Sequence, residues 1–293
     1  MARHLLRLLR VPLAPTAACD SAACLLLALG AAGRPLDAVS PTQWAALAAT
    51  SLCLYGYGMG LNDVADRERD RLLARDRPLP SGRLSLGWAL CVVLLLGAAA
   101  AGLALWQGTH AAAVAALAAA TAYNLQAKHR LVPAAVAMGL VRTANGALGV
   151  LPLVLSGLAP AWTLVAPLCI GLWSAGATVL STTEESPSPP RVRAARMLAA
   201  LAIIGGCGLG MLAAGRVTLP GALLAPSLLG LAAGRLPKPG PAKRQVLEML
   251  LGLYLLAGAV AAGADAFEVD LAAPIVAFVL IYLSQRMIFA LRA

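Results

Sequence analysis

The stretch Gly60–Asp70, GLNDVADRERD, ends a long apolar segment with a dense group of charged residues. Residues 42–61 before it contain no charged side chain. A run of about 20 apolar residues is long enough to cross a bilayer as a helix. The stretch therefore predicts a membrane-spanning helix whose end carries carboxylates and arginines at the membrane edge.

The whole chain has the composition of a membrane protein. Of its 293 residues 60% are hydrophobic and 12% are charged, and the mean hydropathy is +0.80. Soluble domains are about 25% charged. Backbone groups in hydrocarbon need internal partners, so spans must be helices or a closed barrel, and the apolar runs lack the alternation of barrel strands. We predict one all-α polytopic transmembrane domain over residues 1–293.

The apolar runs predict nine or ten spans. The Ala-rich run 109–126 and the run 217–234, which contains Pro220 and Pro226, are the least regular. The predicted spans are 16–33, 42–61, 87–107, 109–126, 131–155, 161–181, 194–214, 217–234, 245–264 and 271–290.

Charge placement sets the orientation. With ten spans both termini lie on one side of the membrane, and 20 of the 23 Lys and Arg residues fall on that side. The positive-inside rule therefore places both termini in the cytoplasm. The net charge of +10 is accounted for by this topology signal and by attraction to anionic membrane lipid. We expect lipid, and no nucleic acid, as a partner.

The carboxylates after Leu61 suggest a metal site. If the helix continues, Asp63, Asp66 and Asp70 lie at i, i+3 and i+7 and stack on one face. Like charges about 4 Å apart repel by about 1 kcal/mol in water and about 4 kcal/mol at an effective dielectric near 20. Mg²⁺ relieves this repulsion and completes its shell with water and phosphate oxygens. A solvated loop of mixed charges is the alternative interpretation.

The same residues resemble a known family. Residues 62–70, NDVADRERD, followed by residues 75–85, RDRPLPSGRLS, resemble the first signature of UbiA-type intramembrane prenyltransferases. Residues 123–128, YNLQAK, and 139–149, GLVRTANGALG, are similar to the fourth and fifth helices of that family.

This resemblance implies a helix bundle around a central cavity that opens to the cytoplasmic face, and a polyprenyl diphosphate donor. Prenyl transfer to a small acceptor of unknown identity would depend on Mg²⁺. Asp63, Asp66 and Asp70 would be the catalytic carboxylates that hold the metal, with Asn62 assisting. The groups predicted to contact phosphate oxygens are Arg75, Arg77, Lys128 and Arg191.

The second acidic motif departs from the family pattern. Residues 181–187 read STTEESP, with Glu184 and Glu185 in place of two aspartates four residues apart. Adjacent side chains diverge on a helix, so one glutamate would reach a second metal. This reduced motif resembles the EboC-like branch of bacterial operons, and we expect a bacterial inner membrane protein. The alternative is a weakened UbiA-like scaffold, or a carrier for a lipid-linked product.

A second alternative is a CDP-alcohol phosphotransferase, which also places aspartates at helix ends. Its pattern requires Gly after an aspartate, whereas Asp66 is followed by Arg67.

Polar residues inside the spans suggest an acceptor site. Arg142 lies near the middle of a span, where an arginine costs about 2.5–3.5 kcal/mol on insertion scales. We predict that Asp20, Arg142 and Asn145 line the acceptor side of the cavity, with a structural Asp20–Arg142 pair as the alternative. The ring of Tyr123, Tyr55 or Tyr57 would shield an allylic cation, and for Tyr55 and Tyr57 an interfacial aromatic belt is the alternative.

Overall fold

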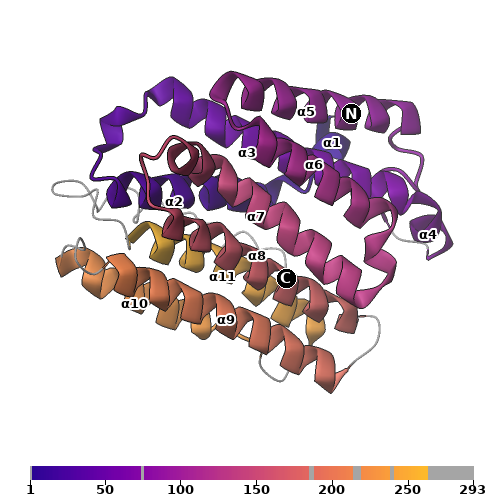
Figure 1. Ribbon diagram of the computed structural model, residues 1–293. Coiled ribbons are helices and arrows are strands. Elements are labelled where there is room, and N and C mark those ends of the chain that lie inside the picture. The colour runs from indigo at the N-terminus through magenta and orange to yellow at the C-terminus, as the bar shows by residue number, and fades with distance from the viewer. Residues whose placement is uncertain (1, 74–75, 185–187, 214–218, 238–240, 263–293) are drawn as a thin grey trace.

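The computed structural model describes residues 2–73, 76–184, 188–213, 219–237 and 241–262. Within these ranges the chain is helical and has no strand. The long helices run side by side in a bundle, with α7 and α8 between the α3, α5 and α6 group and the α9, α10 and α11 group (Figure 1). The predicted all-α fold is therefore confirmed.

Nine helices coincide with nine of the predicted spans, and the tenth span, 271–290, lies outside the described residues. The nine are α2 (Pro15–Ala31), α3 (Pro41–Ala65), α5 (Leu86–Gln107), α6 (His110–Leu125), α7 (Leu131–Leu155), α8 (Val165–Ser181), α9 (Pro189–Ala213), α10 (Leu219–Ala233) and α11 (Ala242–Ala262). Two short helices are α1 (Ala2–Leu8) and α4 (Arg67–Leu72). The 3₁₀ turns are η1 (Val11–Leu13), η2 (Leu36–Ala38), η3 (Ala127–His129), η4 (Ala161–Leu164) and η5 (Thr182–Glu184).

Six helical segments of the described chain are long and apolar enough to cross a membrane, and α6 and part of α10 are shorter apolar helices. The protein is an integral membrane protein.

Local sequence signals explain where two of these helices begin and end. Ser40 and Gln43 form a capping box at the start of α3, with Pro41 in the first turn. Ser85 accepts a hydrogen bond from the Trp88 amide at the start of α5. Gly108 ends α5 with a φ of 72°, a left-handed conformation that favours glycine.

The bundle is held together at glycines where helices touch. A Cβ on Gly149 of α7 would lie 2.2 Å from the Ser21 carbonyl oxygen of α2. A Cβ on Gly171 of α8 would lie 2.0 Å from Thr143 Oγ1 and 2.7 Å from the Gly139 carbonyl oxygen, both on α7. Small residues permit such close approach in the membrane, where packing and not the hydrophobic effect drives helix association.

Candidate active site

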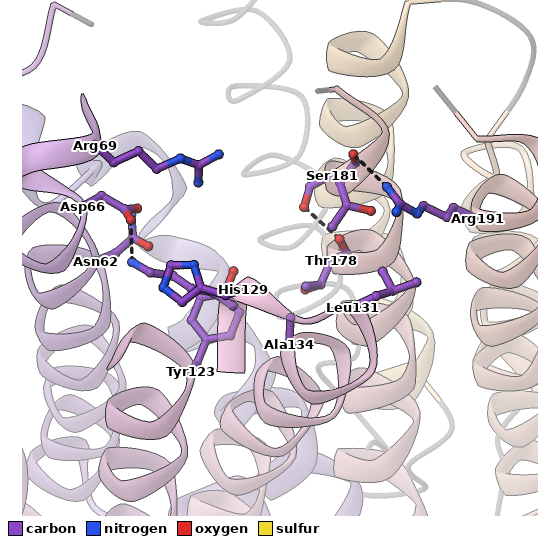
Figure 2. Close-up of a pocket in the computed structure, with 12 residues that line it drawn as sticks. Asn62, Asp66, Arg69, Tyr123, His129, Leu131, Ala134, Thr178, Ser181 and Arg191 are labelled. Atoms are coloured by element: carbon purple, nitrogen blue, oxygen red, sulfur yellow. Dashed lines mark hydrogen bonds and ion pairs between the residues drawn. The ribbon is translucent and has the colours of Figure 1, made fainter. Parts of the chain in front are cut away.

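A polar pocket of about 400 Å³ lies where α3, α6 and α8 end and where α7 and α9 begin. Figure 2 shows its side chains facing one another across the gap between α3 and α8. We call it the polar pocket; its lining residues are Asn62, Asp66, Arg69, Tyr123, Lys128, His129, Leu131, Ala134, Thr178, Ser181, Thr182 and Arg191.

An ion pair forms one wall of the polar pocket. Lys128 Nζ in η3 lies 2.7 Å from Asp66 Oδ1, and the two side chains are only 9% and 13% exposed. Because the pair is sheltered from water, the attraction between its charges is stronger than at an open surface. Two of the predicted site residues are thus brought together by elements far apart in the sequence.

Of the three aspartates predicted to stack on one helical face, Asp63 and Asp70 converge, whereas Asp66 pairs with another residue. Helix α3 ends at Ala65, and Asp66 joins it to α4 with φ −87° and ψ 0°. The i→i−4 hydrogen bonds continue through Asp66, which lines the polar pocket, whereas Asp63 and Asp70 are absent from its lining. The ion pair with Lys128 orients the Asp66 carboxylate towards the polar pocket. A prediction from helical spacing alone does not include this contact.

Asp63 and Asp70 instead share one cation. Arg77 Nη1 lies 2.9 Å from Asp63 Oδ1 and 2.9 Å from Asp70 Oδ2. Both aspartates are buried, and Arg10 Nη2 adds a longer contact of 3.3 Å to Asp63. Two buried carboxylates that converge on a single positive nitrogen form a geometry suited to a cation.

The polar pocket itself carries more positive than negative charge. Three basic side chains line it, those of Arg69, Lys128 and Arg191, together with His129. Among the described residues that line it, only Asp66 carries a carboxylate, and this carboxylate is paired with Lys128. The arrangement is suited to an anion with several negative oxygens.

The end of α8 contributes hydroxyl groups to the opposite wall. Thr178, Ser181 and Thr182 line the pocket, and Arg191 Nη1 donates a hydrogen bond of 3.4 Å to the Thr182 carbonyl oxygen. The backbone of Glu184 ends η5 just beyond them. Its side chain, and the predicted residues Glu185 and Arg75, lie outside the described part of the chain.

The sequence reasoning missed several residues of this site. Thr178, Ser181 and Thr182 are spaced three and four residues apart at the end of an apolar helix, a pattern that places hydroxyls on one face. His129 directly follows the predicted Lys128. Arg10 contacts Asp63 from 53 positions away, and the local sequence carries no signal for such a long-range contact.

The intramembrane polar residues form a separate network between α2 and α7. Arg142 Nη1 lies 2.7 Å from Asp20 Oδ2, and Arg142 Nη2 donates to Thr16 Oγ1 at 2.9 Å. Asn145 Nδ2 donates to the Ala17 carbonyl oxygen at 2.7 Å. These residues do not line the polar pocket, but Tyr123 does.

A further ion cluster fixes the N-terminal helix to the loop after α4. Asp76 accepts contacts from Arg7 at 3.3 Å and from Arg83 at 2.7 Å. The hydrogen bond from Arg7, followed by the charge of Arg83, holds the pKa of this exposed carboxyl below its usual value. The cluster lies next to Arg77 and helps to fix the course of the loop that carries it.

Comparison with known proteins agrees with this fold. Residues 21–186 match the UbiA prenyltransferase family, which is more than half of the chain. The protein belongs to the UbiA prenyltransferase family. A search of curated protein sequences found no match.

Solved structures share the same architecture at low sequence identity. One, from work on digeranylgeranylglyceryl phosphate synthase in membranes, has a TM-score of 0.64 and 18% identity, and the match covers 90% of this chain and 98% of the other. A UbiA homologue from Archaeoglobus fulgidus bound to DMAPP and Mg²⁺ has a TM-score of 0.58, 14% identity and 96% coverage of both chains. The structure of a UbiA homologue from the same organism bound to GPP and Mg²⁺ has a TM-score of 0.58 and 15% identity, and the match covers 96% of both chains.

Proposed function

We propose that this protein transfers a prenyl group from a polyprenyl diphosphate to an acceptor within the membrane, with Mg²⁺ as cofactor. One observation carries the proposal: a sheltered, electropositive pocket lies at one end of the bundle, beside buried carboxylates. Family membership and neighbours that bind DMAPP or GPP with Mg²⁺ support it.

The acidic residues supply oxygen ligands for a magnesium ion, with two carboxylates that converge, although no three metal-binding side chains of the described residues gather at one point. Asp63 Oδ1 and Asp70 Oδ2 lie at the same distance from one guanidinium nitrogen, so both already point to a shared positive charge. Carboxylate oxygens, with an amide oxygen such as that of Asn62, are ligands that Mg²⁺ accepts. Asp63, Asp70 and Asn62 would hold the ion, Asp66 would join them on turning from Lys128, and a glutamate of the pair Glu184 and Glu185 would support a second one. Bound magnesium would neutralise charge that develops on the diphosphate leaving group.

The remaining polar side chains would bind and orient the donor. Lys128 offers a point charge, while Arg191, Arg77 and Arg75 offer planar donors suited to phosphate oxygens. As the bond between the allylic carbon and oxygen breaks, its electron pair stays on the diphosphate, where these fixed cations stabilise it. The ring of Tyr123 at the pocket wall shields the positive charge on the allylic carbon. That carbon then bonds to the acceptor, whose displaced proton leaves to the released diphosphate or to water.

The location of the charges favours catalysis over transport. Transporters place substrate-binding groups near the bilayer midplane, typically in broken helices. Here the polar pocket lies at the ends of α3, α6 and α8. A scaffold or carrier would bind a prenyl diphosphate, or a lipid-linked product, without forming a new prenylated lipid.

A product search tests the proposal and distinguishes these functions. Purified protein is incubated with Mg²⁺, labelled geranylgeranyl diphosphate and a lipid extract of cells that lack the protein, as a source of acceptor. We expect mass spectrometry to show a new prenylated lipid that is absent with the Asp66→Ala variant and present with Glu68→Ala. Glu68 is the matched control because its exposed side chain does not line the polar pocket. Donor binding without any labelled product would instead support the scaffold or carrier.

A further inference from the structure

Three hydroxyl side chains form one wall of the polar pocket. Thr178 and Ser181 belong to α8, Thr182 directly follows it, and all three line the pocket. Their spacing of three and four residues places them on one face of the helix. Figure 2 shows Thr178 and Ser181 on the opposite side of the gap from Asp66. We call these three side chains the hydroxyl wall.

Each hydroxyl of the hydroxyl wall donates its hydrogen to the backbone. The acceptors are carbonyl oxygens of α8, which lie 2.9 Å from Thr178 Oγ1, 2.8 Å from Ser181 Oγ and 2.7 Å from Thr182 Oγ1. A carbonyl oxygen only accepts, so the hydroxyl is the donor in each bond. A hydroxyl has one hydrogen and two lone pairs. The hydroxyl wall therefore offers lone pairs, and no hydrogen, to a molecule in the pocket.

The end of α8 makes this wall still less suited to an anion. The helix ends at Ser181, and the carbonyl groups at the C-terminus of a helix are equivalent to about half an elementary negative charge. This partial charge and the lone pairs of the hydroxyls both repel the oxygens of a diphosphate. The same groups attract a hydrogen-bond donor.

The cations lie around the hydroxyl wall and opposite to it. Lys128 pairs with Asp66 on the other side of the pocket, where Figure 2 also shows Arg69. Arg191 lies beside the hydroxyl wall, and one of its nitrogens donates to the Thr182 carbonyl oxygen at 3.4 Å. The pocket thus has a cationic side for an anion and a lone-pair side for a hydrogen-bond donor. Its volume of about 400 Å³ has room for both, because cavities of about 300–1,000 Å³ hold drug-sized ligands.

We propose that the hydroxyl wall binds the acceptor, and that the acceptor is a polyol, a small molecule with several hydroxyl groups. This inference rests on the proposed function and adds the chemical class of the second substrate. Three lone-pair sites along one helix face match several hydroxyl donors of one molecule. A cationic amine would also donate, but the three basic side chains of the same pocket repel it.

The product of this reaction is an ether. One hydroxyl oxygen of the polyol forms a bond to the allylic carbon as the bond from that carbon to the diphosphate oxygen breaks. The electron pair of the broken bond stays on the diphosphate, and the hydroxyl proton leaves to the released diphosphate or to water. The other hydroxyls of the polyol hold it against Thr178, Ser181 and Thr182.

Removing single hydroxyls tests the proposal. Thr178→Val and Thr182→Val delete the oxygen and keep the shape of the side chain. Thr183→Val is the matched control, because the buried Thr183 hydroxyl makes the same kind of bond, at 2.7 Å to the Leu180 carbonyl oxygen, but does not line the pocket. Each protein is incubated with Mg²⁺, labelled geranylgeranyl diphosphate and a dilution series of an extract of cells that lack the protein.

The measured quantity is the amount of extract that gives half-maximal labelled product. We expect the two wall variants to need about 2–10-fold more extract than the wild type, which corresponds to the loss of one neutral hydrogen bond. Thr183→Val should behave like the wild type. The dissociation constant of the donor should be unchanged in all variants, and this shows that they are folded.

The chemistry of the wild-type product gives a second readout that needs no variant. Acetic anhydride adds an acetyl group to each free hydroxyl, so mass spectrometry should show several acetyl additions on the polar part of the product. A polar part that takes up no acetyl group, or one with the near-ultraviolet absorbance of an aromatic ring, would overturn the proposed class of acceptor.

The remaining outcomes separate the inference from the proposed function. Equal extract requirements in the wild type and the wall variants would overturn the inference alone. Wall variants that need more Mg²⁺ for donor binding, with an unchanged extract requirement, would also overturn it, because the hydroxyls would then bind water on a metal ion. A wild type that binds the donor but forms no product would contradict the proposed function itself.

Discussion

Arg77 Nη1 lies 2.9 Å from Asp63 Oδ1, and the same nitrogen lies 2.9 Å from Asp70. One guanidinium nitrogen thus contacts two buried carboxylates that the sequence separates by seven residues, and Arg10 adds a second cation at Asp63. The loop that carries Arg77 is stiffened by Pro78 and Pro80 and turns at Gly82, whose φ of +71° favours glycine. This contact fixes the direction in which the Asp63 and Asp70 carboxylates point.

Arg77→Gln should make the stability of the protein depend on magnesium. Without the guanidinium two buried carboxylates lose their shared partner, and removing one member of a buried ion pair costs up to about 3–5 kcal/mol. We expect a lower thermal unfolding temperature in EDTA and a recovery with Mg²⁺ that exceeds the effect on the wild type. The control is Arg83→Gln, which removes an exposed pair with Asp76 and should cost less than about 1 kcal/mol. Equal magnesium effects in Arg77→Gln and wild type would contradict the metal assignment.

Lys128→Met should weaken the binding of the prenyl diphosphate donor. The change removes the ammonium that contacts Asp66 and faces the polar pocket. A hydrogen bond to a charged group contributes about 1.5–3 kcal/mol, so we expect the dissociation constant for a prenyl diphosphate to rise by about 10–150-fold. Arg130→Met changes the charge equally at an exposed position outside the pocket lining and should have little effect. Similar affinities in the two variants would show that the charge of Lys128 acts only at long range.

The Asp20–Arg142 pair should behave as a coupled unit. Asp20 is fully buried and its partner nitrogen lies 2.7 Å away. Asp20→Asn or Arg142→Gln alone leaves one buried charge unpaired, so each single change should cost more than a surface substitution. In the double variant both charges are gone, and we expect a coupling energy of about 0.5–3 kcal/mol from unfolding measurements. Full activity in the double variant would assign these residues to structure and not to acceptor binding.

Gly149→Ala should destabilise the contact between α2 and α7. The added methyl group would lie 2.2 Å from the Ser21 carbonyl oxygen, so the helices must move apart. Overpacking of this kind costs about 1–3 kcal/mol. Gly102→Ala on α5 is the matched control because nothing lies within 4 Å of its new Cβ; it should be neutral or slightly stabilising. An equal change in unfolding temperature for both variants would contradict the role of close packing at Gly149.

The sequence was a good guide to the helices and a weaker guide to their contacts. Apolar length and capping residues such as Ser40 and Gly108 act locally, so nine predicted spans match helices of the structure. The different partners of Asp66 and of Asp63 and Asp70 were not predictable in this way. They are ion pairs with Lys128 and Arg77, and helical periodicity does not include such contacts.

In the candidate site, too, the sequence indicated individual residues better than the contacts between helices. Asp66, Lys128, Tyr123 and Arg191 meet in one pocket, although they come from four separate segments. The opposing hydroxyls of α8 depend on which helices are neighbours, and that pairing is set by small residues such as Gly139 and Gly171. A single sequence shows that such residues permit close packing, but it does not show which helix fills the space.

The most direct measurement is equilibrium binding of radiolabelled geranylgeranyl diphosphate to the purified protein, with Mg²⁺ and with EDTA. If the polar pocket holds a magnesium-bound diphosphate, the wild type and Glu68→Ala should bind in Mg²⁺, and the affinity should fall by at least about tenfold in EDTA or in Asp66→Ala, a loss of about 1.4 kcal/mol. Binding that is unchanged by EDTA and by the loss of Asp66 would contradict the account.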